Sequence, residues 1–150
     1  MTSTGTATAS IEVAVDPKTA FDVFTADIGI WWKRGTHYWV DPERGQAMRF
    51  EPHVGGRLVE VYDTATGEGH DIGLVTAWEP GSRLHFTWRM PDWPAGVSTD
   101  VEVDFEPVGD NTLVTVVHHG WDRIGDGVDR ASGYGSGWSE LLTFFAARAR

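Results

Sequence analysis

The chain has 150 residues and a formal net charge of −10, a length that suits one domain whose core buries about 70 % of the surface of the unfolded chain. Its 12 lysine and arginine residues are scattered, so no basic stripe exists to neutralise phosphates, and we expect neither nucleic acid nor an anionic membrane as a partner. The absence of cysteine excludes disulfides, thiolate catalysis and zinc–thiolate sites.

The N-terminal nine residues are mainly threonine, serine, alanine and glycine without apolar periodicity. They predict a disordered tail over residues 1–9, followed by a single domain over residues 10–150. This segment lacks the charged and apolar regions of a signal peptide, and no apolar run approaches the roughly 20 residues of a membrane span. We therefore expect a cytoplasmic protein.

The domain is predicted to begin with a strand over Ser10 to Val15, where apolar and polar residues alternate. Asp16 and Pro17 then supply a helix N-cap and a proline at the first helical position. The short helix that follows has an apolar side, and residues 28–32 predict a second short helix or turn beside it.

Six further strands are predicted by alternation between apolar and polar residues. They cover 46–51, 57–62, 68–78, 83–90, 99–107 and 112–119. In the fourth of these, Leu84, Phe86 and Trp88 fall on one face, because successive side chains of a strand point to opposite sides. That face is expected to be buried.

Charge predicts how two of these strands pair. Residues 99–107 carry acidic side chains on one face, and the preceding strand carries basic ones. An antiparallel hairpin around residues 91–98 that sets Arg89 opposite Asp100 also sets His85 opposite Asp104 and Arg83 opposite Glu106. Each such pair contributes roughly 0.2 to 1 kcal/mol.

The segment over residues 122–137 contains five glycines and is predicted to be a loop. From Trp138 onward, the apolar residues Trp138, Leu141, Leu142 and Phe145 follow the spacing i, i+3, i+4, i+7. This spacing places one apolar stripe on a final helix that faces the sheet.

Four local features of the central strands carry a family resemblance. Gly55-Gly56 precede one strand, Gly73-Leu74-Val75 lies within the next, Glu79-Pro80 begins a turn, and Leu84 to Trp88 forms a Leu-x-Phe-x-Trp strand. In these features the chain resembles the family of the activator of heat-shock-protein-90 ATPase homologues. The resemblance extends to residues 11–32, 114–121 and 137–145, and so covers most of the chain.

That family belongs to the START-like helix-grip superfamily (SRPBCC). The resemblance implies an α+β fold in which a curved antiparallel sheet of about six or seven strands wraps a long C-terminal helix, with two short helices after the first strand. A cavity often lies between sheet and helix in this superfamily. No catalytic residue, metal site or cofactor is predicted, and the adjacent His118 and His119 cannot chelate one ion because they point to opposite strand faces.

The eight tryptophans suggest what such a cavity would bind. Rigid aromatic walls with N–H donors suit a flat or lipid-like ligand, although aromatic side chains also dominate ordinary cores. Trp93 lies between two prolines in a loop that could form an exposed lid or a partner contact. His118 shares strand parity with inward-facing valines, so it either stands at the cavity mouth or bonds the nearby backbone. The predicted ligand-binding residues are Trp31, Trp32, Phe86, Trp88, Trp93, His118, Trp138 and Leu142.

Three functions compete at this point. The first is binding of a small hydrophobic or aromatic ligand in the cavity between the sheet and the C-terminal helix. The second, implied by the resemblance, is a cochaperone-like regulator with a heat-shock-protein-90 ATPase as its partner. The third is a cyclase or hydrolase, which would need a polar pair inside the pocket from His118, His70 or Asp100. The lack of a recognisable catalytic motif favours binding over catalysis.

Overall fold

A computed structural model describes residues 5–149, without the side chain of Val128. Within these residues the chain forms seven strands, two short helices, one 3-10 turn and a long C-terminal helix. In order they are β1 (Ala7–Val13), α1 (Pro17–Ala26), α2 (Ile28–Trp31), β2 (Ala47–Phe50), β3 (Arg57–Val61), β4 (Gly69–Glu79), β5 (Arg83–Trp88), β6 (Thr99–Val108), β7 (Asn111–His119), η1 (Trp121–Arg123) and α3 (Gly127–Arg148).

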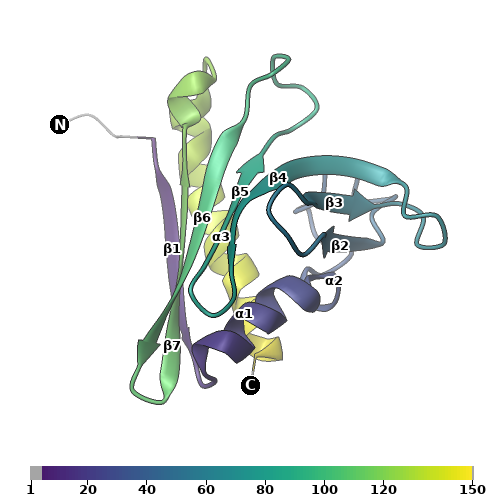
Figure 1. The fold of residues 1–150 in the computed structure, drawn as a ribbon. Helices are drawn as coiled ribbons and strands as arrows, with labels where there is room; N and C mark the ends of the chain where they lie inside the picture. Colours follow the sequence, from purple (N-terminus) through teal and green to yellow (C-terminus); the bar gives the residue numbers. More distant parts are fainter. Residues whose placement is uncertain (1–4, 150) are drawn as a thin grey trace.

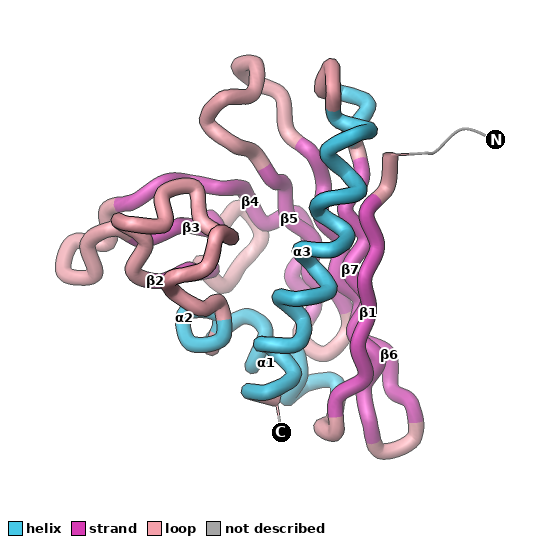
Figure 2. The backbone as a smooth tube through the Cα atoms, turned by 180° about the vertical axis from the view of Figure 1, so that it is seen from behind, coloured by secondary structure: helices cyan, strands magenta, loops and turns pink. Residues whose placement is uncertain are grey.

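The strands make one antiparallel sheet in the order β1-β7-β6-β5-β4-β3-β2. Figure 1 shows β4 curving away from β5 toward β3 and β2, and Figure 2 shows α3 lying along the sheet beside β1 and β7. The sheet therefore wraps the C-terminal helix. This arrangement is the helix-grip fold expected from the family resemblance, with the two short helices directly after the first strand.

The first strand begins earlier than the sequence pattern indicates. β1 starts at Ala7, which pairs with His118 of β7, so residues 7–9 are part of the sheet rather than of a disordered tail. Ala7 and Ala9 are both buried, and their small side chains gave no hydrophobic alternation that could be recognised. Residues 1–4 of the predicted tail lie outside the described part of the chain.

The register predicted between β5 and β6 is wrong by two residues. Arg83 pairs with Asp104 and His85 with Glu102, while Arg89 lies beyond the end of β5. The Arg89 guanidinium donates instead to main-chain carbonyls of the following loop, at 2.6 Å to Pro94 and 2.8 Å to Val97. Hydrogen bonds from Arg89 to several loop carbonyls stabilise the protein more than one ion pair on the surface would, because such a pair contributes little free energy in water.

The glycine-rich segment predicted as a loop is helical from residue 127. α3 has 22 residues, and its first half contains most of those glycines. Tertiary contact explains the first of them, because a Cβ on Gly127 would lie 1.9 Å from the carbonyl oxygen of Trp121. Packing against η1 and β1 thus overrides the low helix propensity of glycine. Within residues 5–149, neither α3 nor any other helix is long and apolar enough to cross a membrane.

The bend of β4 divides the concave face into a filled end and an open end. β4 has irregular pairing with both neighbours, and a Cβ on Gly73 would lie 1.7 Å from the carbonyl oxygen of Thr87. Such irregularities bend and twist a strand. At the end near α1 the space is closed by rings, with Phe24 lying 5.3 Å from Phe145 and Phe21 lying 5.3 Å from Phe105. Beyond this cluster the helix and the bent strand diverge.

Candidate functional site

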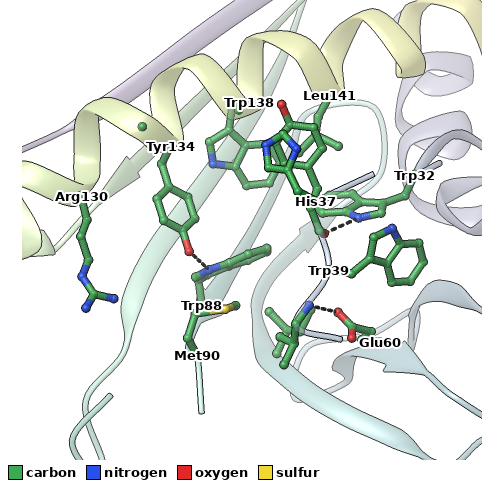
Figure 3. A pocket seen from close by; sticks show the side chains of 15 residues that line it. Trp32, His37, Trp39, Glu60, Trp88, Met90, Arg130, Tyr134, Trp138 and Leu141 are labelled. Carbon is green, nitrogen blue, oxygen red and sulfur yellow. Dashed lines mark hydrogen bonds between the residues drawn. The ribbon is translucent and has the colours of Figure 1, made fainter. Parts of the chain in front are cut away.

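A cavity of about 450 Å³ lies where α3 diverges from the bent strands. Its walls come from α3, from β3, β4 and the end of β5, and from residues 37–40 of the long segment between α2 and β2 (Figure 3). The residues around it are Trp32, His37, Tyr38, Trp39, Val40, Glu60, Ile72, Trp88, Met90, Arg130, Gly133, Tyr134, Gly137, Trp138 and Leu141. The lining is mostly aromatic and aliphatic, which suits an apolar ligand.

Three of the tryptophans predicted as ligand-binding residues meet at this cavity. Trp138 projects from α3, Trp88 from the end of β5, and Trp32 directly follows α2. Their ring centroids lie 5.8 to 6.3 Å apart, with Trp138 at 5.9 Å from Trp32 and nearly perpendicular to it. These tilted and edge-to-face contacts hold each ring in place. Together the three rings form a rigid apolar wall.

The indole N–H groups at the cavity are already engaged inside the protein, contrary to the expectation that they would serve a ligand. Four indoles are involved, and each donates to one acceptor. The bonds are Trp32 to the Tyr38 carbonyl at 2.9 Å, Trp39 to the Lys33 carbonyl at 2.9 Å, Trp88 to the Tyr134 hydroxyl at 3.3 Å, and Trp138 to the His118 Nδ1 at 3.1 Å. An indole has a single N–H, so these rings offer a ligand their faces and edges only.

His118 is fully buried behind the tryptophan wall and does not line the cavity. Its Nδ1 must accept, because the Trp138 indole can only donate, so the proton of the neutral ring is on Nε2. Nε2 lies 2.7 Å from the Thr99 hydroxyl, which in turn donates to the Trp88 carbonyl at 3.2 Å. His118 therefore fixes both Trp138 and Trp88, which makes it a positioning residue.

Burial, and to a smaller degree the neighbouring His119, lowers the pKa of His118 to about 3. The ring stays neutral at physiological pH and has no contact with the cavity. The other two residues considered for a catalytic pair are also absent from the lining. Asp100 pairs with Arg123 at 2.8 Å on the outer face of the sheet, and His70 lies near the start of β4. The cavity therefore does not contain the polar pair that a cyclase or hydrolase would need from these residues.

Four of the predicted binding residues belong to the filled core instead of the cavity. Trp31 packs on Phe24 at 5.1 Å, and Leu142 is fully buried on α3. Phe86 points into the concave face and packs on Phe50 at 5.2 Å. Trp93 is 4 % exposed, and its ring packs edge-on against that of Trp121 in η1, with 5.7 Å between the ring centroids. It is therefore not the exposed loop tip suggested by its flanking prolines.

Glu60 is a cavity residue that the sequence analysis did not identify. It lies on β3, is fully buried, and accepts hydrogen bonds from the main-chain N–H groups of Val40 at 2.7 Å and Asp41 at 2.9 Å. The Tyr62 hydroxyl donates a third bond at 2.7 Å. This carboxylate ties the segment between α2 and β2 to the sheet. Its strand parity with Leu58 was a usable signal, because a carboxylate at an inward position needs partners.

Two further groups of lining residues were missed for different reasons. Tyr134 and Gly133 lie in the part of α3 predicted to be a loop, although Ala131, Tyr134 and Trp138 share the helical stripe once the helix begins at residue 127. Residues 37–40 belong to no helix or strand and carry no periodic pattern. Nothing in the sequence indicated that they would cover the cavity.

Comparison with solved structures finds the same fold in several other proteins. A protein from Mesorhizobium loti superposes with a TM-score of 0.69 at 18% identity, over 95% of this chain and 94% of that one. The Aha1 dimer from Colwellia psychrerythraea gives 0.67 at 17% identity, over 96% and 95%. An HSP90 activator from Plasmodium falciparum gives 0.55 at 20% identity, over 76% and 71%.

A search of curated proteins finds no significant match. The family model described as "Activator of Hsp90 ATPase homolog 1-like protein", in contrast, matches residues 14–150. This match spans all the elements from α1 to α3, including every wall of the cavity. On that evidence the chain belongs to the Activator of Hsp90 ATPase homolog 1-like family.

Proposed function

We propose that this protein binds a small hydrophobic or aromatic ligand in the cavity between α3 and the bent strands. The observation that carries the proposal is a mostly apolar cavity of about 450 Å³ whose tryptophan N–H groups are all engaged within the protein. Because these rings have no free N–H donor, polar groups on a ligand gain little from contact with them. Apolar surface of the ligand that is buried against the rings contributes roughly 25 cal/mol of binding free energy per Å². Such a wall favours a flat ligand with few polar atoms.

Binding is tested directly by thermal unfolding and tryptophan fluorescence with naphthalene and biphenyl as probes. A probe that binds only the folded protein raises its stability by about 2.7 kcal/mol when present at 100 times its dissociation constant. We expect a saturable rise in the melting temperature together with a change in emission from the tryptophan wall. The proposal would be contradicted if neither naphthalene nor biphenyl changed the melting temperature or the fluorescence.

A substitution at Gly133 gives this test a structural control. A Cβ at this position meets no atom within 4 Å, and the residue borders the cavity. Gly133→Leu should therefore place an apolar side chain at the opening and weaken naphthalene binding by about tenfold, the loss of roughly 1.4 kcal/mol. Because leucine is a better helix former than glycine, the variant should also be more stable by about 0.5 to 1 kcal/mol. Calorimetric titration and urea unfolding measure the two effects.

The matched control is Gly135→Ala on the same helix. A Cβ there lies 4.0 Å from Ala7 of β1, so it faces the sheet edge and not the cavity. This variant should gain stability through the same helix-propensity effect and keep the affinity of the parent protein. A loss of affinity in both variants would point to a change in the whole helix rather than to occlusion.

A cochaperone-like role is the second candidate, and it rests on the family match over residues 14–150 and on the resemblance to an HSP90 activator. It predicts that the purified protein stimulates the ATPase of heat-shock protein 90. The Gly133→Leu variant separates the two roles. Stimulation that survives occlusion of the cavity would assign the chaperone contact to another surface, and lack of any stimulation would contradict the role.

A further inference from the structure

One end of the cavity is polar. Tyr134 and Arg130 lie one turn apart on α3 and border the same space, next to Met90 (Figure 3). The Tyr134 side chain is half-buried and its hydroxyl lies beside the indole of Trp88. Because the remaining walls are mostly apolar, a bound ligand would be oriented with its polar group toward this end.

The Tyr134 hydroxyl has a proton to donate. Its one hydrogen bond in the described part of the chain comes from Trp88, and an indole N–H can only donate, so the tyrosine oxygen is the acceptor in that bond. Burial raises the pKa of Tyr134, which keeps the hydroxyl protonated at neutral pH. The other cavity tyrosine differs, because the Tyr38 hydroxyl donates to Glu140. Tyr134 is therefore the cavity tyrosine with an uncommitted donor.

The charge at this end decides which acceptor suits that donor. The Arg130 Nε donates to Asp126 at 3.0 Å, and the Arg130 Nη1 lies 3.8 Å from an Asp92 oxygen. Two carboxylates thus face one guanidinium, and the whole chain carries a net charge of −10. An anionic group placed here would meet a local excess of negative charge. A neutral oxygen acceptor carries no net charge and would not be repelled in this way.

We propose that the ligand carries a neutral carbonyl oxygen that accepts a hydrogen bond from the Tyr134 hydroxyl, with its flat apolar body against the tryptophan wall. The class includes aromatic ketones, quinones and lactones. This inference rests on the proposed ligand-binding function and adds the orientation and polarity of the ligand. Tyr134 is the residue that distinguishes a carbonyl ligand from a hydrocarbon of the same shape.

Three probes of similar shape test the proposal by calorimetric titration: 2-acetylnaphthalene, 2-isopropylnaphthalene and 2-naphthoate. They present a ketone, a methyl and a carboxylate at the same position. In the parent protein the ratio of ketone affinity to hydrocarbon affinity should be roughly five- to tenfold higher than in Tyr134→Phe, the worth of one neutral hydrogen bond. Naphthoate should bind more weakly than the ketone.

Tyr38→Phe is the matched control, since it removes a hydroxyl of the same cavity that is already committed to Glu140. It should leave the ketone-to-hydrocarbon ratio unchanged. The infrared carbonyl band of 2-acetylnaphthalene bound to the parent protein adds a measurement that needs no variant. It should lie at lower wavenumber than in hexane, as for a hydrogen-bonded ketone.

The outcomes are distinct. An equal ketone-to-hydrocarbon ratio in the parent protein and in Tyr134→Phe, or an unshifted carbonyl band, would overturn the carbonyl assignment and leave the apolar site standing. Tighter binding of naphthoate than of the ketone would also overturn it, because the site would then select an anion. Failure of all three probes to bind would overturn the proposed function and this inference with it.

Discussion

Replacing Glu60 by alanine should lower the free energy of unfolding by about 3 kcal/mol or more. The carboxylate is fully buried and accepts from two main-chain N–H groups, those of Val40 and Asp41, as well as from the Tyr62 hydroxyl. Its removal leaves these donors without their partner, and each unsatisfied buried donor costs about 1 to 3 kcal/mol. Urea unfolding of the variant and the parent protein measures the difference.

Two further variants serve as controls for Glu60→Ala. Glu60→Gln keeps the size of the side chain but turns one acceptor into a donor, so it should lose a smaller part of the stability. Glu68→Ala removes an exposed carboxylate from the same hairpin and should change stability by less than about 0.5 kcal/mol. A Glu60→Ala variant as stable as Glu68→Ala would contradict the role of the carboxylate as an anchor.

The anchoring role also predicts a local effect. Residues 40–41 are held by Glu60, and the same segment covers the cavity. Amide hydrogen exchange at residues 37–41 should therefore accelerate in Glu60→Gln, while exchange in β6 and β7 should follow global stability. This cover has no sequence periodicity, so its position depends on a few specific bonds.

Acidification from pH 7 to pH 5 should destabilise the protein through His118 by about 2 kcal/mol. The folded-state pKa is lowered to about 3, mainly by burial, while the unfolded side chain titrates near 6.5. Between these values the unfolded chain binds a proton that the folded protein does not, so the free energy of unfolding falls as the pH falls. The stability that the neutral His118 ring contributes is fully present above about pH 6.5 and is lost progressively as the pH falls toward 3.

The control for this effect is His118→Gln. Glutamine retains an acceptor for Trp138 and a donor for Thr99 but does not titrate. The variant should be less stable at pH 7, because it loses the ring contact with Trp121 at 4.4 Å. Its stability should fall by about 2 kcal/mol less than that of the parent between pH 7 and pH 5. Urea unfolding curves with the same pH dependence in both proteins would contradict a buried neutral histidine.

Most of the fold could be predicted from local sequence patterns. The parity of Leu84, Phe86 and Trp88 identified a strand with one buried face, and all three are 5 % exposed or less. The predictions that failed depended on contacts between distant segments. The first turn of α3 lies against η1, where only a glycine fits at residue 127, and Arg89 bonds the loop that follows β5 instead of a carboxylate of β6.

The candidate site was less predictable than the fold. Aromatic composition identified Trp32, Trp88 and Trp138, which do line the cavity, but it equally selected Trp31 and Trp93, which fill the core. Burial of a large ring is favourable in either setting, so composition alone cannot separate a wall from a core. The distinction depends on the irregular β4, because the cavity lies where α3 diverges from the bent strands.

The most direct test of the cavity as a binding site is an NMR titration of the eight indole N–H signals with 2-isopropylnaphthalene. Ring currents of a bound probe should shift the signals of Trp32, Trp88 and Trp138 saturably, with one dissociation constant. The signals of Trp31 and Trp121, which lie in the filled core, should move far less. Unchanged signals from the three wall tryptophans at saturating probe would contradict the account.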